Sequence, residues 1–276
     1  MDLLDQYARE IRAKVVELSH KTRTPHLGSQ LSCIDLLVTV YWRMLRLDEH
    51  EFESRERDQF ILSKGHAAPA LYTTLAFRGF LDFGILERMA SKGSPLAEQP
   101  APFCIPGVEW ATGSLGHGLG VATGKAIGAR IAGRESRFIV LLSDGECNEG
   151  SVWEAAMYAA AQKLENLMVF IDFNKWQATS RSRETMALDP LAEKWKAFGW
   201  ETLEVDGHDL EAIGKATSRF PSSSGRPLAI IAHTTKGKGI DFMEDDNNWH
   251  YRIPTEEEVI LAKQQLGIKA TPDPHQ

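Results

Sequence analysis

Hydrophobic and polar residues along this chain follow two different periods in turn. Near the N-terminus, apolar residues from Leu4 to Leu18 recur at steps of three and four, which predicts an amphipathic helix. A second helix is predicted after Ser32, which can serve as its N-cap, with an apolar face that runs from Ile34 to Leu45. The chain therefore opens with two predicted helices whose apolar faces need a core to pack against.

Further along, short apolar runs replace the helical stripes. The runs predicted as buried strands are 137–143, 167–173, 200–205 and 227–233, and helical patterns follow at 149–164 and 209–220. Such alternation predicts a mainly parallel sheet covered by helices on both faces, so the expected fold class is doubly wound α/β. The segment 220–227 fits a loop better than a linker. We expect one domain over residues 1–276, with a disordered tail at 267–276.

Composition and charge narrow the class of protein. With 43% hydrophobic and 25% charged residues, the chain is typical of soluble globular proteins. A net charge of −7 without a Lys/Arg block argues against nucleic acid, and no apolar stretch reaches the roughly 18–20 residues that span a bilayer. An acidic start argues against a signal peptide, and widely spaced cysteines fit a reducing compartment. A cytoplasmic location is therefore expected.

Polar side chains follow two neighbouring predicted strands where each strand ends. Asp144 follows the first of these strands and Asn174 the second. Ligands gather at the carboxyl ends of parallel strands, and two oxygen ligands there could share one Mg²⁺, which takes about six oxygens. This predicts a diphosphate held through magnesium. The alternative is that Asp144 caps a helix and Asn174 is a turn residue.

Histidines supply further candidates. Those that stand in loop-like segments marked by glycine or proline are His26, His66, His117, His208 and His250. Any one of them is more often a structural hydrogen-bonding residue than a catalyst, but several around one cleft could bind phosphate or move protons. Other candidates are weaker, because segment 116–125 lacks the spacing of a Walker loop and Cys147 is more often a packed residue.

The chain also carries a series of motifs in a characteristic order. They are "PHLGSQLS", "LSKGHAAPALY", "ATGSLGHGLGVATG", "SDGECNEGSVWEAAMYAA", "FNKWQ", "VDGHD" and "TTKGKGIDFMEDDNNWH". In this order they resemble the transketolase family, and specifically the thiamine-diphosphate-binding N-terminal half found in split, two-gene transketolases. The resemblance runs from about residue 5 to about residue 260. It implies thiamine diphosphate and Mg²⁺ as cofactors.

The resemblance assigns roles to single positions. It implies that Asp144, Asn174 and the main-chain carbonyl of Trp176 are magnesium ligands, in agreement with the argument from the strand ends. Gly145 would let the backbone approach the diphosphate closely, since it lacks a Cβ. His66 would contact the diphosphate.

Other positions would surround the reacting part of the cofactor. The resemblance places His26 and His250 along the path to the thiazolium carbon, and the backbone of Gly113 and Leu115 at the aminopyrimidine. Glu149 matches an acidic residue in the family's subunit-interface network. The catalytic candidates are His26, His66, His117, His250 and Gln99, and the cofactor-binding candidates are His66, Gly113, Leu115, Asp144, Gly145, Glu146, Glu149, Asn174 and His250.

Several positions depart from the family pattern. Ser143 stands where the family usually has glycine, Phe173 replaces the first asparagine of a pair, and Trp176 replaces an aliphatic residue. His117 stands where many relatives carry glutamine. The most consequential departure is Gln99, at the expected position of a histidine that touches the donor's hydroxyl group, because it puts the ordinary sugar-phosphate donor in doubt.

The activity that the resemblance implies is transfer of a two-carbon ketol unit from a ketose donor to an aldehyde acceptor. The family's full chain also carries a pyrimidine-binding domain and a C-terminal domain, for which this chain has no room. We therefore expect a companion subunit, an α2β2 assembly and no activity from the chain alone. Two alternatives remain: a related synthase that uses an α-keto acid or a modified sugar, and a non-catalytic homologue that binds the cofactor or scaffolds a partner.

Overall fold

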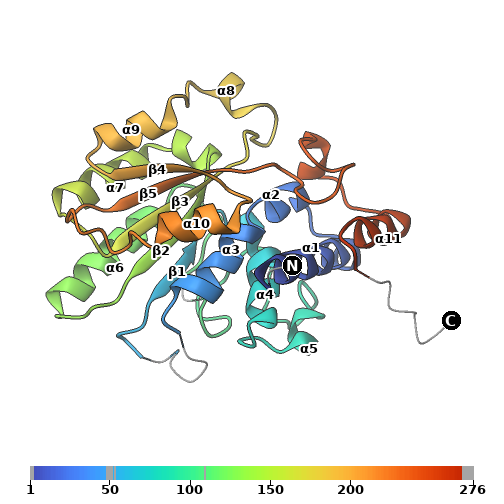
Figure 1. Cartoon of the computed structure of the whole chain (residues 1–276). Helices are drawn as coiled ribbons and strands as arrows, with labels where there is room; N and C mark the ends of the chain where they lie inside the picture. The colour runs from blue at the N-terminus through green and yellow to red at the C-terminus, as the bar shows by residue number, and fades with distance from the viewer. Residues whose placement is uncertain (1–2, 48–51, 53, 109, 269–276) are drawn as a thin grey trace.

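One parallel sheet forms the centre of the molecule. The computed structural model describes residues 3–47, 52, 54–108 and 110–268, and its five strands lie in the order β1-β2-β3-β5-β4 (Figure 1). They are β1 (Gln59–Leu62), β2 (Phe138–Ser143), β3 (Leu167–Phe173), β4 (Glu201–Asp206) and β5 (Leu228–His233). Four strands coincide with the predicted apolar runs. The pattern does not predict β1, because this strand has only four residues and begins with a polar one.

Helices cover both faces of the sheet. One face carries α6 (Gly118–Ile131), α7 (Gly150–Ala161) and α9 (Leu191–Ala197), and the other carries α1 (Leu3–Thr22), α3 (Ile34–Thr39), α4 (Ala68–Phe77) and α10 (Leu210–Thr217) (Figure 1). The remaining α-helices are α2 (Leu27–Ser32), α5 (Phe83–Leu86), α8 (Ser182–Thr185) and α11 (Glu256–Gln265). This arrangement confirms the doubly wound α/β class.

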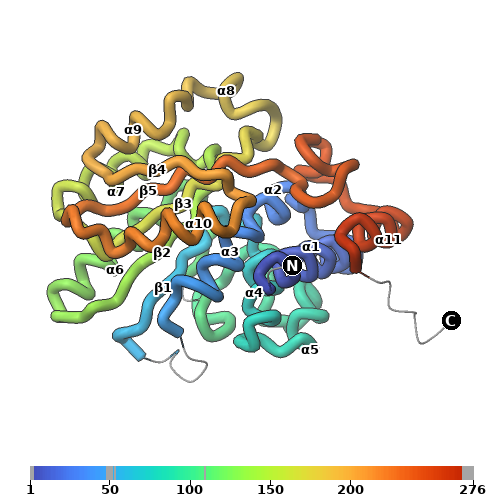
Figure 2. The backbone as a smooth tube through the Cα atoms, viewed as in Figure 1, coloured from blue at the N-terminus to red at the C-terminus, as the bar shows by residue number. Residues whose placement is uncertain are grey.

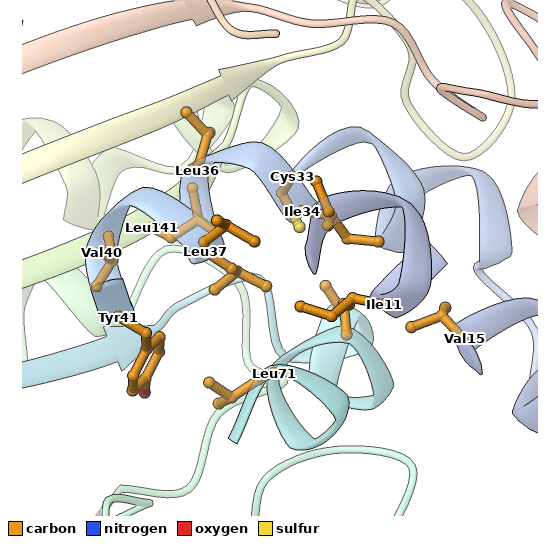
Figure 3. Packing of buried hydrophobic residues seen from close by; sticks show 14 of the residues in the cluster. Ile11, Val15, Cys33, Ile34, Leu36, Leu37, Val40, Tyr41, Leu71 and Leu141 are labelled. Atoms are coloured by element: carbon orange, nitrogen blue, oxygen red, sulfur yellow. The ribbon is translucent and has the colours of Figure 1, made fainter. Parts of the chain in front are cut away.

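Each face of the sheet has its own hydrophobic core. Along β2, Ile139 and Leu141 belong to the core beneath α1, α3 and α4, whereas Val140 and Leu142 belong to the core beneath α6 and α7. Figure 3 shows part of the first core, where side chains of α1, α3 and α4 gather beside Leu141. Every residue of β2 and β3 is buried, which explains why these strands are apolar runs without alternation.

The two predicted N-terminal helices are present, but the predicted N-cap is wrong. The second helix begins at Ile34, and a π-helical turn, Val40–Met44, continues it. Ser32 is instead the last residue of α2, and its hydroxyl donates to the Ser29 carbonyl and to the carboxylate of Asp172. The Ser32 hydroxyl therefore binds the buried carboxylate of Asp172 on β3 instead of capping the helix as the sequence pattern predicts.

The two terminal helices lie side by side (Figure 2). Lys263 of α11 pairs with Glu17 of α1 at 2.6 Å. Of the tail predicted at 267–276, Gly267 and Ile268 come after Leu266, the C-cap of α11, and the rest lies outside the described residues. Among the helices described, none combines the length and apolar character that crossing a membrane requires.

Candidate active site

Segments far apart in sequence meet in a cavity of about 380 Å³ at the carboxyl ends of β2 and β3. Its lining consists of His26, Ser29, His66, Gln99, Gly113, Leu115, Ser143, Asp144, Gly145, Asn148, Glu149, Asn174, Trp176, Gln177, Ala178, His250 and Tyr251. Larger cavities also lie elsewhere among the described residues, of about 600, 460, 410 and 410 Å³. The first two are lined by none of the predicted site residues, and one of the last two is lined by a single histidine candidate, His208. The convergence of predicted residues therefore marks the smaller cavity as the candidate site.

Asp144 is a fully buried carboxylate at the end of β2. One oxygen accepts from the Gly145 amide at 2.9 Å, and the other accepts from the Lys175 amide at 2.9 Å and the Ser182 hydroxyl at 2.7 Å. Burial raises the pKa of Asp144 to about 7. All three donors are neutral, so they do not neutralise the negative charge of the ionised Asp144 carboxylate, which a bound cation would stabilise. This is the electrostatic condition of a metal ligand.

Asn174 lies beside Asp144 because the strands are in register, with Ser143 opposite Asp172. The amide oxygen of Asn174 accepts from the Trp176 amide at 3.0 Å, and the amide nitrogen lies 3.4 Å from Asp172. Asp144 also caps the 3₁₀ turn Gly145–Asn148, and Asn174 forms a turn with Trp176. The alternative local roles are thus present together with the strand-end pairing, and each oxygen retains capacity to accept more.

The cavity beside Gly145 fits an anionic group. A Cβ built at Gly145 would meet only the Gln177 side chain, at 3.6 Å, which is an ordinary contact. The protein itself therefore does not require a glycine here, whereas a ligand that approaches the backbone would. The side-chain nitrogen of Gln177, Nε2, is also buried without a hydrogen-bond partner among the described residues. It is therefore a donor available to such a ligand.

A buried ion pair lies beneath the two strand ends. Lys64 and Asp172 are both fully buried and form a salt bridge, and Ser32 and Thr234 donate to the same carboxylate. Burial alone would raise the pKa of Asp172, but the charge of Lys64 and these hydrogen bonds hold it below its ordinary value. The sequence pattern does not predict this pair. The available signal was a charged residue inside the otherwise apolar run 167–173.

Three predicted histidines converge on the cavity. The ring centroid of His26 lies 5.4 Å from that of His66 and 4.9 Å from that of His250. Burial and the nearby charge of Lys236 lower the pKa of His250 to about 3, and burial lowers the pKa of His26 and His66 as well. Lys236 donates to the Nδ1 atom of His250 at 3.0 Å. These rings are therefore neutral at pH 7, and His250 carries its proton on Nε2.

The loop segment 99–115 brings a side chain and a glycine together at the cavity. The carboxamide oxygen of Gln99 lies 1.6 Å from the place that a Cβ of Gly113 would occupy, and Gly113 has a φ of +133°. The positive φ favours glycine, and any side chain at this position would also force the Gln99 carboxamide to move. Leu115 and Glu149 also line the cavity.

Three histidine and glutamate candidates stand outside the cavity lining. His117 is exposed, with Nδ1 3.2 Å from the Leu115 carbonyl. His208 bonds to Asp35 at 2.7 Å and accepts from the Thr235 amide at 2.8 Å. Glu146, which sequence analysis placed at the cofactor, is fully buried.

The oxygens of Glu146 accept hydrogen bonds from the loops around the site. The donors are the Ser63 hydroxyl and the backbone amides of Gly116 and Ser143. Burial raises the pKa of Glu146 despite these bonds. Its geometry fits a residue that holds the surrounding loops, and not one that touches a ligand in the cavity.

Comparison with known families agrees with this geometry. Residues 4–274 match the family described as "Transketolase, thiamine diphosphate binding domain". The chain belongs to the transketolase family. This confirms the predicted family and the thiamine-diphosphate-binding nature of the domain.

Several relatives of this transketolase domain are subunits of split enzymes. It is 40% identical over 266 residues to a subunit of the apulose-4-phosphate transketolase of Actinobacillus succinogenes, covering 96% of each chain. It is 36% identical over 267 residues to the corresponding subunit from Phocaeicola vulgatus, covering 97% of this chain and 95% of that one. The prediction of a transketolase-type N-terminal subunit is therefore confirmed.

Solved transketolases share the fold. The transketolase of Campylobacter jejuni is 29% identical with a TM-score of 0.91, and the alignment covers 97% of this chain and 43% of that one. The transketolase of Leishmania mexicana also gives a TM-score of 0.91, at 25% identity, with 97% and 42% covered. The chain thus spans less than half the length of these single-chain enzymes.

Proposed function

We propose that this chain is the cofactor-binding subunit of an enzyme that transfers a two-carbon ketol unit from a ketose donor to an aldehyde acceptor. The observation that supports it most is the pairing of Asp144 and Asn174 at adjacent strand ends, beside a glycine that the protein itself does not require. Such a site suits a magnesium-bound diphosphate. The family match supplies the identity of that diphosphate as thiamine diphosphate.

Each group at the site has a proposed task. Asp144, Asn174 and the main-chain carbonyl of Trp176 would hold Mg²⁺. The unpartnered side-chain nitrogen of Gln177, Nε2, would donate to a diphosphate oxygen. Thiamine diphosphate, when bound, supplies the carbanion that carries the two-carbon unit. The protein contributes binding, orientation and exclusion of water.

The histidines would handle the substrate's hydroxyl groups. A neutral imidazole can donate from one nitrogen and accept at the other, so it can orient a hydroxyl or take its proton. His250 is fixed in one tautomer by Lys236 and therefore presents its Nε2 proton as a donor. We propose that His26 and His250 act in this way and that His66, whose ring lies 5.4 Å from that of His26, contacts the diphosphate.

A companion subunit would complete the site. The chain covers nearly the whole length of its relatives from split enzymes but only 42–43% of the single-chain transketolases. We propose that the missing pyrimidine-binding and C-terminal domains come from a second polypeptide, in a cytoplasmic α2β2 assembly with two active sites. Glu149, which is exposed at the cavity rim, would face a neighbouring chain.

The donor is proposed to be a modified ketose. Relatives include transketolase subunits named for apulose 4-phosphate and for 6-deoxy-6-sulfo-D-fructose. Gln99 also lines the cavity where the family commonly carries a histidine, and a carboxamide cannot become cationic as an imidazole can. Both points favour a donor other than xylulose 5-phosphate or fructose 6-phosphate.

Reconstitution with a panel of substrates tests the proposal. The purified chain should give no ketol transfer by itself, and addition of the companion subunit should produce transfer that depends on thiamine diphosphate. Mass-resolved products from ketoses, α-keto acids and aldehydes would identify donor and acceptor. Turnover by this chain alone, after mass spectrometry has excluded a co-purified partner, would contradict the split-enzyme proposal.

A further inference from the structure

The loop after β3 carries two of the three proposed metal ligands and contacts the third. This metal loop, residues 174–182, turns back on itself through an antiparallel bridge between Trp176 and Arg181 and a bond from the Ser182 amide to the Lys175 carbonyl at 3.0 Å. It carries Asn174 and the Trp176 carbonyl, and its Ser182 hydroxyl donates to Asp144. A change in this loop would therefore move the whole ligand set.

Three side chains close over the outside of the metal loop. The guanidinium of Arg181 lies over the Trp176 ring, 3.8 Å from its centroid. The two terminal nitrogens of Arg181 donate to the two oxygens of Asp245 at 2.5 and 2.6 Å, and the Trp176 indole donates to Asp245 at 2.8 Å. Each member contacts the other two, so together they form a clamp. A bidentate pair combined with a cation–π contact is more directional than a single surface ion pair.

The clamp joins the metal loop to the segment that carries His250. Asp245 lies in that segment, anchored by its amide to the Lys236 carbonyl at 2.8 Å. Asn247 adds a bond from its side chain to the Ala178 carbonyl at 3.2 Å. The metal ligands and the histidine that faces the substrate are therefore parts of one connected structure.

Backbone strain on both sides of the junction shows why the loop needs such a hold. Lys175 has a φ of 70° and Asp245 a φ of 58°, both in the left-handed region. A residue with a Cβ pays roughly 1–2 kcal/mol for this conformation, which persists only where its surroundings fix it. Asp245 is itself a member of the clamp and Lys175 directly precedes Trp176, so the clamp supports the backbone at both positions.

We propose that Trp176, Arg181 and Asp245 are positioning residues that hold the metal loop in its cofactor-binding conformation before the cofactor binds. The inference rests on the proposed function, because the loop's task is to present ligands to Mg²⁺ and diphosphate. Their side chains contact each other, and Trp176 is the one of the three that also lines the cavity. A loop that is ordered in advance lowers the entropy lost on binding and so tightens the cofactor.

The test uses Arg181→Ala in the complex with the companion subunit, with two readouts. In the cofactor-free complex, the backbone amides of Gln177 and Ser182 should exchange hydrogen about tenfold faster than in the wild type. In calorimetry with Mg²⁺, the Kd for thiamine diphosphate should rise about tenfold, equivalent to about 1.4 kcal/mol. Turnover at saturating cofactor should change less than about twofold, since positioning acts on binding.

Two matched variants sharpen the test. Arg181→Lys keeps a cation over the indole but not the bidentate pair, so both effects should be intermediate. Arg219→Ala removes the exposed partner of Glu201, 3.3 Å away at the far end of the sheet, and should change neither readout. Unchanged exchange or unchanged cofactor affinity in Arg181→Ala would overturn the inference. If the wild-type complex bound no thiamine diphosphate, the proposed function would fail, and the exchange measurement would still decide for or against the clamp.

Discussion

Replacing Lys64 by methionine should expose how strongly the site depends on its buried ion pair. Lys64 and Asp172 are both 0% exposed, and the Asp172 carboxylate also lies 3.4 Å from the amide nitrogen of Asn174. Lys64→Met keeps the volume of the side chain but leaves Asp172 charged, buried and without a cation. The hydroxyls of Ser32 and Thr234 cannot replace that charge.

The expected loss of stability follows from burial. Breaking a fully buried pair by removal of one partner costs about 3–5 kcal/mol, because an uncompensated charge remains. For a chain of this size each kcal/mol lowers Tm by roughly 2–4 °C, so the variant should melt about 10 °C below the wild type. The double variant Lys64→Met/Asp172→Asn should recover most of the loss, since it removes the stranded charge and retains an acceptor.

The loss should depend on pH, and its sign is fixed by the two pKa shifts. In the wild type the pKa of Asp172 is lowered, so its contribution to stability is present above the unfolded pKa and is lost as pH falls. In Lys64→Met the pKa of Asp172 should be raised, so the folded state takes up a proton and its stability falls as pH rises. The difference between the two proteins should therefore be larger at pH 7 than at pH 5.

Thermal and denaturant unfolding of the same assembly at both pH values would check these expectations. A free energy of unfolding for Lys64→Met within about 0.5 kcal/mol of the wild type would refute the reasoning, since surface changes alone have effects of that size. A double variant as unstable as the single one would also refute it, because the stranded charge would then not be the cause.

Three further predictions concern the cofactor and the donor. Asp144→Ala should abolish Mg²⁺-dependent binding of thiamine diphosphate, and Asn174→Ala should weaken it; unchanged affinity of Asp144→Ala in calorimetry would remove the site assignment. Gly145→Ala should leave Tm nearly unchanged, since its Cβ would have only an ordinary contact at 3.6 Å, but should raise the cofactor Kd. An unchanged cofactor Kd would contradict a role of Gly145 in close approach of the diphosphate. Gln99→His should improve turnover of xylulose 5-phosphate and fructose 6-phosphate, and efficient use of both sugars by the native complex would argue against a role of Gln99 in donor choice.

The sheet and the strand-end residues could be predicted because burial of the strands leaves a recognisable pattern of apolar residues in the local sequence. β2 and β3 are covered on both faces, so they are apolar runs, interrupted near the end of β3 by Asp172, and Asp144 and Asn174 directly follow them. Parallel register then places those ends side by side. The signal for β1 is weak because the strand has only four residues, of which Ile61 and Leu62 are buried, and its place at the sheet edge depends on pairing with β2.

Contacts between distant segments could not be predicted in the same way. Lys64 meets Asp172 across 108 residues, and Arg181 meets Asp245 across 64. Lys64, Arg181 and Asp245 look like ordinary surface charges in their own segments. Asp172 lies in an apolar run that indicates burial, but that run does not indicate which cation it meets. The same reason accounts for Ser32, whose hydroxyl binds a carboxylate 140 residues away instead of capping a helix.

The strand order also determines which strands lie at the edges of the sheet, where two copies of this protein could pair and aggregate. One edge of the sheet is β1, which is too short to offer a long row of free amides and carbonyls. The other is β4, which carries Glu201, Glu204 and Asp206, so a second strand arriving there would meet negative charge. Short edges and charged edges both discourage the strand-to-strand pairing that leads to aggregation. Association of this protein is thereby left to its helices and loops, where side chains can discriminate between a correct partner and an unrelated chain.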